Sequence, residues 1–368
     1  MLDSGSMKIL LICGSSQTVY NFRMPLVRCL KKKGFQISVI AYDNLFAEKI
    51  KKDDIKFYDI GGTNRSINPL GILKIKKRYK KIIKKENPDI VFTFMLKPNT
   101  FGVIEAKKAG IKNIYSMVEG AGDVFINNTL KWKLVRVIVC WLYKKAFRNV
   151  RKVFFLNEDD KREFIDRKLV QSEQCEIIHG IGVDLERFSY RPIKNRRTFL
   201  MVARMLKTKG IYEYCECARL VRKKYPDAVF NYLGAEGNVK VADIQEYIDD
   251  GSVRYLGTTN DVRPYLEECF VEVLPSYREG LGLVNAEAGA TGRASITCNT
   301  IGTKDTVKDG YNGFLVGVGD SKALAEKAIW CIVHPEETEQ MGRNSRTFAE
   351  EHFDQEKINE KIVSILLN

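Results

Sequence analysis

The chain has 368 residues, 45% of them hydrophobic, which is enough to bury a large core and favours two domains over one. No apolar run approaches the roughly 18 to 20 residues that cross a bilayer, so a transmembrane helix is excluded. The nine cysteines form no CxxC pair and the apolar run after Met7 is too short for a signal peptide, which together indicate a reduced, cytoplasmic compartment.

The first half of the chain alternates short apolar runs with helical patterns. KILLIC at Lys8 to Cys13 predicts a buried strand, a polar loop begins at Gly14, and a helical pattern extends from Arg23 to Lys33. FQISVIAY predicts the next strand. Further apolar runs follow at residues 88–95, 113–118 and 152–157, between longer basic segments. This alternation predicts a parallel sheet covered by helices on both faces.

The same pattern restarts after RPIKNRR at residues 191–197, a polar stretch that suits a linker. TFLMVARM, AVFNYLG, VRYLG, FVEVLPS and ASITC predict strands, with helical segments between them. We therefore predict an α/β protein of two doubly wound, Rossmann-like domains, residues 7–193 and 194–368, that face each other across a cleft. The final helical segment, about residues 355–367, could pack on either domain.

Two cations follow the first strand of the second domain. In VARMLKTKG, residues 202–210, Arg204 leaves the strand and Lys209 precedes the next helix. Open α/β sheets bind ligands at the carboxyl ends of their strands, and a guanidinium and an ammonium beside a helix amino terminus can neutralise a diphosphate. Solvated surface cations are the alternative, because this pattern is common.

Two glutamates stand eight residues apart in SYREGLGLVNAEAGATGR, residues 276–293. Glu279 falls on the loop after FVEVLPS, and Glu287 falls in the helix that follows. These positions suit two parts of an elongated ligand better than the two sides of one scissile bond, as in a glycoside hydrolase. An exposed helix residue and an incidental loop charge are the alternative. The first N–H groups of the helix, which could approach a phosphate, would come from Gly280, Leu281, Gly282 and Leu283.

These segments resemble glycosyltransferase family 4, whose members retain the anomeric configuration and have the GT-B fold. The spacing of Glu279 and Glu287 is similar to the E-x7-E signature of the family, VARMLKTKG is similar to its diphosphate-binding segment, and DTVKDGYNGFLV, residues 305–316, is similar to its closing segment. In the first half, YNFRMPLV, FMLKPNTFG, SMVEGAGDVF and GIGVDLERF resemble the branch that builds polyprenyl-diphosphate-linked glycans, which includes N-acetylgalactosaminyltransferases.

The resemblance implies a donor site with assigned roles. Arg204 and Lys209 would neutralise the diphosphate of a UDP sugar, Glu279 would contact the transferred sugar, and Glu287 would hold the ribose. Arg204, Lys209 and Glu279 are thus the candidate catalytic residues. The N–H groups of residues 280–283 and the loop at Gly14 would complete the diphosphate cradle. No DxD pattern stands at a strand exit, so we expect neither a metal ion nor a cofactor.

Three residues of the first half are candidates for acceptor binding. Arg23 and Lys97 lie in family-like segments after strands and could meet acceptor phosphates, or could be ordinary surface cations. Glu119 places a charge in EGAG where the family often has glycine-leucine-glycine, so it bears on acceptor specificity.

The positive charge is confined to the first half. Residues 1–190 hold 36 Lys and Arg against 20 Asp and Glu, and residues 191–368 hold 24 against 26. Two segments, residues 73–86 and 131–152, carry eight cations each, and the second also carries aromatic residues. Such segments suit an anionic membrane surface or a lipid diphosphate; a solvated helix face is the alternative. We expect no nucleic-acid partner, because no known binding module accompanies the charge.

We therefore predict a bacterial, metal-independent hexosyltransferase on the inner face of the cytoplasmic membrane. It would move a hexose or N-acetylhexosamine from a UDP sugar to a polyprenyl-diphosphate-linked saccharide during polysaccharide or glycan assembly. Two alternatives stay open: a transferase that acts on a soluble acceptor, and a catalytically silent homologue that binds nucleotide sugar and supports a partner transferase.

Overall fold

A computed structural model describes residues 7–62, 68–120, 123–126 and 129–367 of the chain. The chain forms two compact units. The amino-terminal unit contains residues 1–181 and 356–368, and the carboxyl-terminal unit contains residues 182–355.

The boundary between the units differs from the predicted one at 193/194. Residues 182–193 belong to the carboxyl-terminal unit because backbone hydrogen bonds attach them to it. The N–H of Val183 donates to the carbonyl of Phe353 at 2.7 Å, and the N–H of Arg191 donates to the carbonyl of Thr291 at 3.1 Å. The polar stretch that suited a linker therefore runs along the surface of the second unit.

The amino-terminal unit contains a seven-stranded parallel sheet with the order β3-β2-β1-β4-β5-β6-β7. The strand β1 lies inside the sheet and is flanked on both sides, so Ile9 pairs with Ile37 of β2 and with Ile90 of β4. The strands are β1 (Lys8–Ile12), β2 (Gln36–Ala41), β3 (Lys56–Asp59), β4 (Ile90–Phe94), β5 (Asn113–Val118), β6 (Lys152–Phe155) and β7 (Cys175–Ile177).

Helices cover both faces of this sheet, as its apolar runs predict. Side chains of α2 (Met24–Lys32), α3 (Ala47–Lys51) and α15 (Gln355–Leu367) form the core on one face. Side chains of α4 (Pro69–Glu86), α5 (Val103–Lys108), α7 (Leu130–Phe147) and α8 (Glu158–Asp166) form the core on the other. The short elements are α1 (Ser16–Thr18), η2 (Val19–Arg23), η3 (Pro98–Gly102), α6 (Asp123–Ile126) and η4 (Ser172–Gln174).

The carboxyl-terminal unit contains a six-stranded parallel sheet with the order β10-β9-β8-β11-β12-β13. Its strands are β8 (Thr198–Val202), β9 (Val229–Leu233), β10 (Arg254–Tyr255), β11 (Val271–Leu274), β12 (Ala294–Cys298) and β13 (Gly313–Val316).

Two cores again lie on opposite faces of the second sheet. The helices α9 (Ile211–Lys224) and α13 (Ser321–Val333) bury their apolar sides in one core, and α11 (Arg263–Glu268), α12 (Leu283–Ala290) and the end of α14 (Pro335–His352) contribute to the other. The remaining elements are η5 (Lys207–Lys209), η6 (Val241–Ile244) and α10 (Gln245–Asp249). The predicted fold of two doubly wound α/β domains is confirmed.

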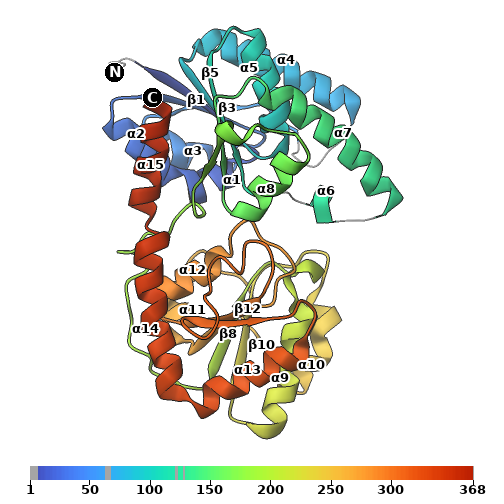
Figure 1. Cartoon of the computed structure of the whole chain (residues 1–368), viewed down its shortest axis with the longest axis vertical. Coiled ribbons are helices and arrows are strands. Elements are labelled where there is room, and N and C mark those ends of the chain that lie inside the picture. Colours follow the sequence, from blue (N-terminus) through green and yellow to red (C-terminus); the bar gives the residue numbers. More distant parts are fainter. Residues whose placement is uncertain (1–6, 63–67, 121–122, 127–128, 368) are drawn as a thin grey trace. The chain divides into compact units, whose positions relative to one another are not determined.

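The final helix α15 belongs to the amino-terminal unit, although the residues just before it belong to the other unit. It lies beside α2 (Figure 1) and buries Ile358, Ile362, Val363 and Leu366 in the core of that unit. Among the described residues, every helix is too short or too polar to cross a bilayer.

Candidate functional site

Two loops at the carboxyl edge of the second sheet hold Lys209 and Glu279 together. Lys209 ends the 3₁₀ turn η5 after β8, and Glu279 lies on the loop after β11. The carbonyl of Thr208 accepts the N–H of Tyr277 at 2.9 Å and the hydroxyl of Ser276 at 3.2 Å. These bonds fasten the loops to each other, and the Lys209 ammonium forms an ion pair with the Glu279 carboxylate. Two of the predicted site residues are therefore in direct contact.

Gly210 makes this approach of the two loops possible. Its φ of 75° lies in the left-handed region, and a Cβ atom at this position would stand 2.1 Å from the carbonyl oxygen of Pro275. Only glycine can meet both conditions without displacing a loop. The turn that carries Lys209 thus depends on the absence of a side chain one residue later.

Arg204 follows β8 and is exposed. Its backbone carbonyl accepts the N–H of Leu206 at 2.7 Å, which helps to shape the turn. Within the described part of the chain, its guanidinium has no hydrogen-bond or ion-pair partner. The group is free to bind an anion at the same loop that carries Lys209.

The amino terminus of α12 differs from the predicted phosphate cradle. The N–H of Gly282 donates to the carbonyl of Gly302 at 3.1 Å, and the N–H of Leu283 donates to the carbonyl of Leu281 at 2.7 Å. At least these two of the four predicted donors, Gly280 to Leu283, are therefore engaged within the protein. The Gly282 bond holds the loop of Glu279 against the loop after β12, where the N–H of Glu279 also donates to the carbonyl of Ile301 at 3.0 Å.

Glu287 lies in α12 and is partly buried. Burial raises the pKa of its carboxyl to about 7; Arg187 opposes this shift and Asp261 adds to it. Arg187 and Asp261 are themselves an ion pair at 4.0 Å. Near neutral pH, Glu287 therefore exists in both protonation states, and either state can bind hydroxyl groups.

Sequence reasoning missed one carboxyl of this region, that of Glu272. It lies in the middle of β11 with no exposed surface, opposite Ser295 of β12, and neither oxygen has a hydrogen-bond partner among the described residues. Burial raises its pKa to about 8, with smaller contributions from Glu287 and Glu279 that Ser295 opposes. A single acid inside the apolar run FVEVLPS was the available signal.

In the amino-terminal unit, the loop at Gly14 is fixed to the neighbouring loop. Gly14 is buried and follows β1. The N–H of Ser16 donates to the carboxylate of Asp43, after β2, at 3.2 Å, and the N–H of Phe46 donates to the hydroxyl of Ser16 at 3.0 Å. The predicted phosphate-side loop is thus rigidly supported at the carboxyl edge of the first sheet.

The structure joins Arg23 and Glu119, two predicted acceptor-side residues, in an ion pair. Arg23 ends η2 and is buried over the ring of Phe94, 4.6 Å from its centroid. Burial lowers the pKa of its guanidinium to about 10. Glu119, just after β5, stays partly exposed and supplies the neutralising charge. The unusual acid of this chain therefore has a defined partner.

Lys97, the third acceptor-side candidate, lines a cationic pocket. It follows β4 and is buried, its ammonium lies 5.8 Å from the centroid of the Tyr42 ring, and burial lowers its pKa. The pocket has a volume of about 240 Å³ and is also lined by Lys74 and Arg78 of α4 and by the glycines at 61, 62 and 71. Three cations around one small cavity suit a phosphate group.

Solved structures share the two-domain fold of this chain. The chain superimposes on Anabaena HepE, solved in complex with UDP and glucose, with a TM-score of 0.81 and 19% identity over 98% of this chain and 100% of that one. It therefore has the GT-B fold, the two-domain α/β architecture of one large class of glycosyltransferases.

Family profiles place the chain within that class. Residues 8–157 match the family described as glycosyl transferase 4-like, and residues 183–348 match glycosyl transferases group 1. The chain belongs to these glycosyltransferases.

Two curated relatives cover most of the chain. It is 29% identical over 335 residues to the N,N'-diacetylbacillosaminyl-diphospho-undecaprenol alpha-1,3-N-acetylgalactosaminyltransferase of Campylobacter jejuni, covering 87% of this chain and 88% of that protein. It is 28% identical over 309 residues to the UDP-Gal:alpha-D-GlcNAc-diphosphoundecaprenol alpha-1,3-galactosyltransferase of Escherichia coli, covering 79% and 78%.

Proposed function

We propose that this glycosyltransferase moves a hexose or N-acetylhexosamine from a UDP sugar to a polyprenyl-diphosphate-linked saccharide in bacterial surface-glycan assembly. The names of the two relatives support this acceptor class. The observation that carries the proposal is the Lys209–Glu279 ion pair, held by two bonded loops next to Arg204, whose guanidinium has no partner among the described residues.

This arrangement provides what a UDP-sugar donor needs. The Lys209 ammonium has three N–H donors, so it can keep Glu279 in place and still bind a phosphate oxygen. The second carboxylate oxygen of Glu279 can accept hydroxyls of the sugar, and Glu287 can hold the ribose. Arg204 adds a planar donor that binds phosphate through two hydrogen bonds.

Transfer proceeds with retention of configuration in this proposal. The bond between the anomeric carbon and the phosphate oxygen breaks, and its electron pair stays on UDP. The acceptor hydroxyl attacks from the same face and gives its proton to the departing phosphate oxygen. Arg204 and Lys209 stabilise the growing negative charge, an electrostatic effect that is worth roughly 3 to 4 kcal/mol for one positioned donor. Neither a metal ion nor a cofactor takes part.

The acceptor side uses the amino-terminal unit. The cationic pocket of Lys74, Arg78 and Lys97 is the candidate site for the lipid diphosphate, and the ion pair of Arg23 with Glu119 is a second candidate contact for the acceptor on this unit. The enzyme acts on the inner face of the cytoplasmic membrane, where the positive charge of this unit meets anionic lipid. Nucleic acid is not a partner in this proposal.

Release of UDP from a panel of UDP sugars, with and without an extract of polyprenyl-diphosphate-linked saccharides, tests the function. We expect release to require one sugar and the lipid-linked acceptor together, and to collapse in Glu279→Ala. Transfer to water-soluble saccharides with equal efficiency would instead identify a soluble acceptor. Binding of UDP without turnover of any pair would identify a catalytically silent protein.

A further inference from the structure

Helix α7 carries an exposed apolar stripe in addition to its buried side. Its inner side places Val139, Tyr143, Ala146 and Phe147 in the core, as expected for a helix of a soluble domain. On its outer side, the following large apolar side chains are more than half exposed: Leu130, Leu134, Val137, Ile138 and Trp141. At 3.6 residues per turn, these side chains fall within an arc of roughly 100° around the helix.

The charged residues of α7 are all cations. The sequence of the helix, LKWKLVRVIVCWLYKKAF, contains five cations and no Asp or Glu. The ammonium of Lys145 lies 5.1 Å from the centroid of the Trp141 ring, at the end of the stripe. Apolar side chains flanked by lysines, with an aromatic ring among them, are typical of helices that lie in the interface of an anionic membrane.

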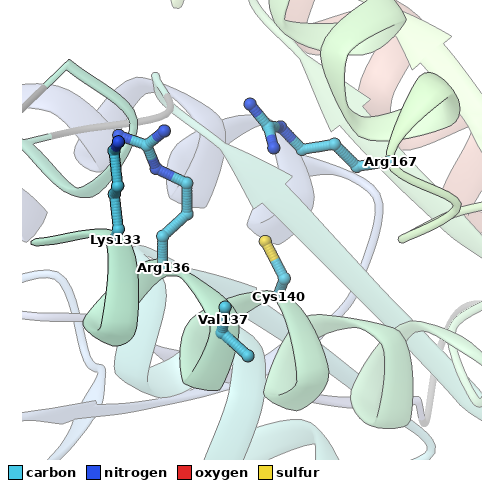
Figure 2. Close-up of a pocket in the computed structure, with 5 residues that line it drawn as sticks. All are labelled: Lys133, Arg136, Val137, Cys140 and Arg167. Atoms are coloured by element: carbon cyan, nitrogen blue, oxygen red, sulfur yellow. The ribbon is translucent and has the colours of Figure 1, made fainter. Parts of the chain in front are cut away.

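A cationic pocket opens beside the stripe. It has a volume of about 410 Å³ and is lined by Lys133, Arg136, Val137 and Cys140 of α7 and by Arg167, which follows α8. Figure 2 shows the long side chains of Lys133 and Arg136 rising from α7 and the guanidinium of Arg167 extending toward the same space, above the sulfur of Cys140.

Two of the three cations in this pocket are held in place by the protein. The Nε of Arg136 donates to the carbonyl of Val124 at 2.8 Å. Arg167 donates to the Glu163 carboxylate at 3.1 Å, which offsets one of the three charges. A positive pocket with positioned guanidinium groups remains, and such a pocket fits a phosphate group.

A second helix supports the same surface. Helix α4 packs on the same face of the sheet as α7, exposes Leu70 and Leu73 one turn apart, and carries eight cations against the single acid Glu86. This side of the amino-terminal unit therefore presents two basic helices with apolar side chains.

We propose that α7 is the membrane-docking helix of this protein, inserting the stripe of Leu130, Leu134, Val137, Ile138 and Trp141 into the headgroup region of an anionic bilayer. The pocket of Lys133, Arg136 and Arg167 receives the phosphate of an anionic phospholipid headgroup. The inference rests on the proposed function only for the identity of the membrane, which is the one that holds the acceptor. A second copy of the chain fits this surface less well, because two unopposed basic faces would repel each other.

Co-flotation of the whole chain with vesicles of phosphatidylglycerol, compared with vesicles of phosphatidylcholine, tests the docking. We expect binding to phosphatidylglycerol at low salt. The double variant Val137→Ser with Trp141→Ser should weaken it at least about tenfold, since two exposed apolar side chains are lost. The control Val333→Ser, which removes a half-exposed apolar side chain of α13, should leave binding unchanged.

The pocket has its own test. The double variant Lys133→Gln with Arg136→Gln should weaken binding to phosphatidylglycerol several-fold and flatten its salt dependence, whereas Lys322→Gln, an exposed cation of the other unit, should not. Insertion of Trp141 can also be measured directly. The difference in fluorescence between the unchanged chain and Trp141→Phe is the emission of Trp141. Brominated acyl chains in phosphatidylglycerol vesicles should quench this emission.

Three results would overturn the inference: no binding to phosphatidylglycerol vesicles, binding that the stripe variant leaves intact, or stripe-dependent dimers in sedimentation without vesicles. Its failure can be told apart from failure of the proposed function. Transfer to a short-chain, water-soluble analogue of the acceptor without vesicle binding refutes docking alone. Stripe-dependent vesicle binding by a chain that turns over no UDP sugar refutes the transferase alone.

Discussion

Among single residues, Arg204 offers the simplest test of the proposed site. It is exposed and, among the described residues, has no protein partner, so its removal should not disturb the fold. We expect Arg204→Ala to lower turnover at least about a hundredfold, because one positioned donor to a developing charge is worth several kcal/mol. Arg254→Ala, which removes an exposed arginine of β10, is the matched control. Near-normal turnover of Arg204→Ala would remove this residue from the site.

The buried carboxyl of Glu272 makes stability depend on pH. Its pKa is about 8 in the folded protein, against an ordinary value of 4.5, so the folded state binds the proton more tightly than the unfolded state does. The stabilisation is complete below about pH 4.5 and is lost as the pH rises through about 8. In this window the free energy of unfolding should fall by up to about 1.4 kcal/mol per pH unit. Glu287, with a pKa of about 7, contributes in the same direction below neutrality.

Replacement of Glu272 by glutamine isolates this effect. We expect Glu272→Gln to flatten the decline in stability above pH 7, where Glu287 has largely ionised. Urea unfolding at several pH values measures this change in stability. The fluorescence of Trp330 monitors the unfolding in a chain that carries Trp132→Phe and Trp141→Phe, so that only the carboxyl-terminal unit is observed. Equal slopes in the two proteins would show that Glu272 does not carry the pH dependence.

Among the elements, the turn η5 provides a test of how the site is built. Gly210→Ala should cost several kcal/mol of stability and displace Lys209, because the new Cβ atom overlaps the carbonyl of Pro275 at a left-handed φ. Gly257 has nearly the same φ, 77°, but a Cβ atom added there would meet nothing within 4 Å. The control Gly257→Ala should therefore cost only about 1 to 2 kcal/mol and leave transfer unchanged. Similar losses in both variants would mean that strain, not overlap, dominates.

The main strands could be predicted from the sequence because buried parallel strands are continuous apolar runs. The run at 113–118 coincides with β5, and those at 88–95 and 152–157 contain β4 and β6. The edge strand β3 was not predicted, because its four residues are partly exposed and mixed in character. The π-helical turn η2, which carries Arg23, was also not foreseen, since it has no distinct residue pattern.

Much of the candidate site could be predicted because ligands of open α/β sheets bind at the carboxyl ends of the strands. Arg204 and Glu279 stand at or just after the ends of predicted strands, and Lys209 stands before the helix that follows the first of these strands. The contacts between these residues could not be predicted in this way. The ion pair of Lys209 with Glu279, and that of Arg23 with Glu119, join residues that are far apart in the chain. Their contact depends on strand order and loop geometry, which residue patterns do not specify.

For the molecule as a whole, the docking of α15 on the amino-terminal unit is the feature with the clearest energetic consequence. Ile362 is buried there, so Ile362→Ala should lower the stability of that unit by about 2 to 4 kcal/mol. The exposed neighbour Ser364→Ala should have little effect. Unfolding in a Trp330→Phe background, where Trp132 and Trp141 report on the amino-terminal unit, measures both. An unchanged midpoint for Ile362→Ala would show that α15 adds little to this core.

The division of the chain also fixes the order in which its parts can be completed during synthesis. Every residue of the carboxyl-terminal unit leaves the ribosome before α15 does, because that unit lies between residues 182 and 355. Until the whole of the other unit has been made, the face of the amino-terminal unit that receives Ile358 and Ile362 stays uncovered. The nascent carboxyl-terminal unit can therefore finish folding first, while the unit translated earliest is the last to close its core.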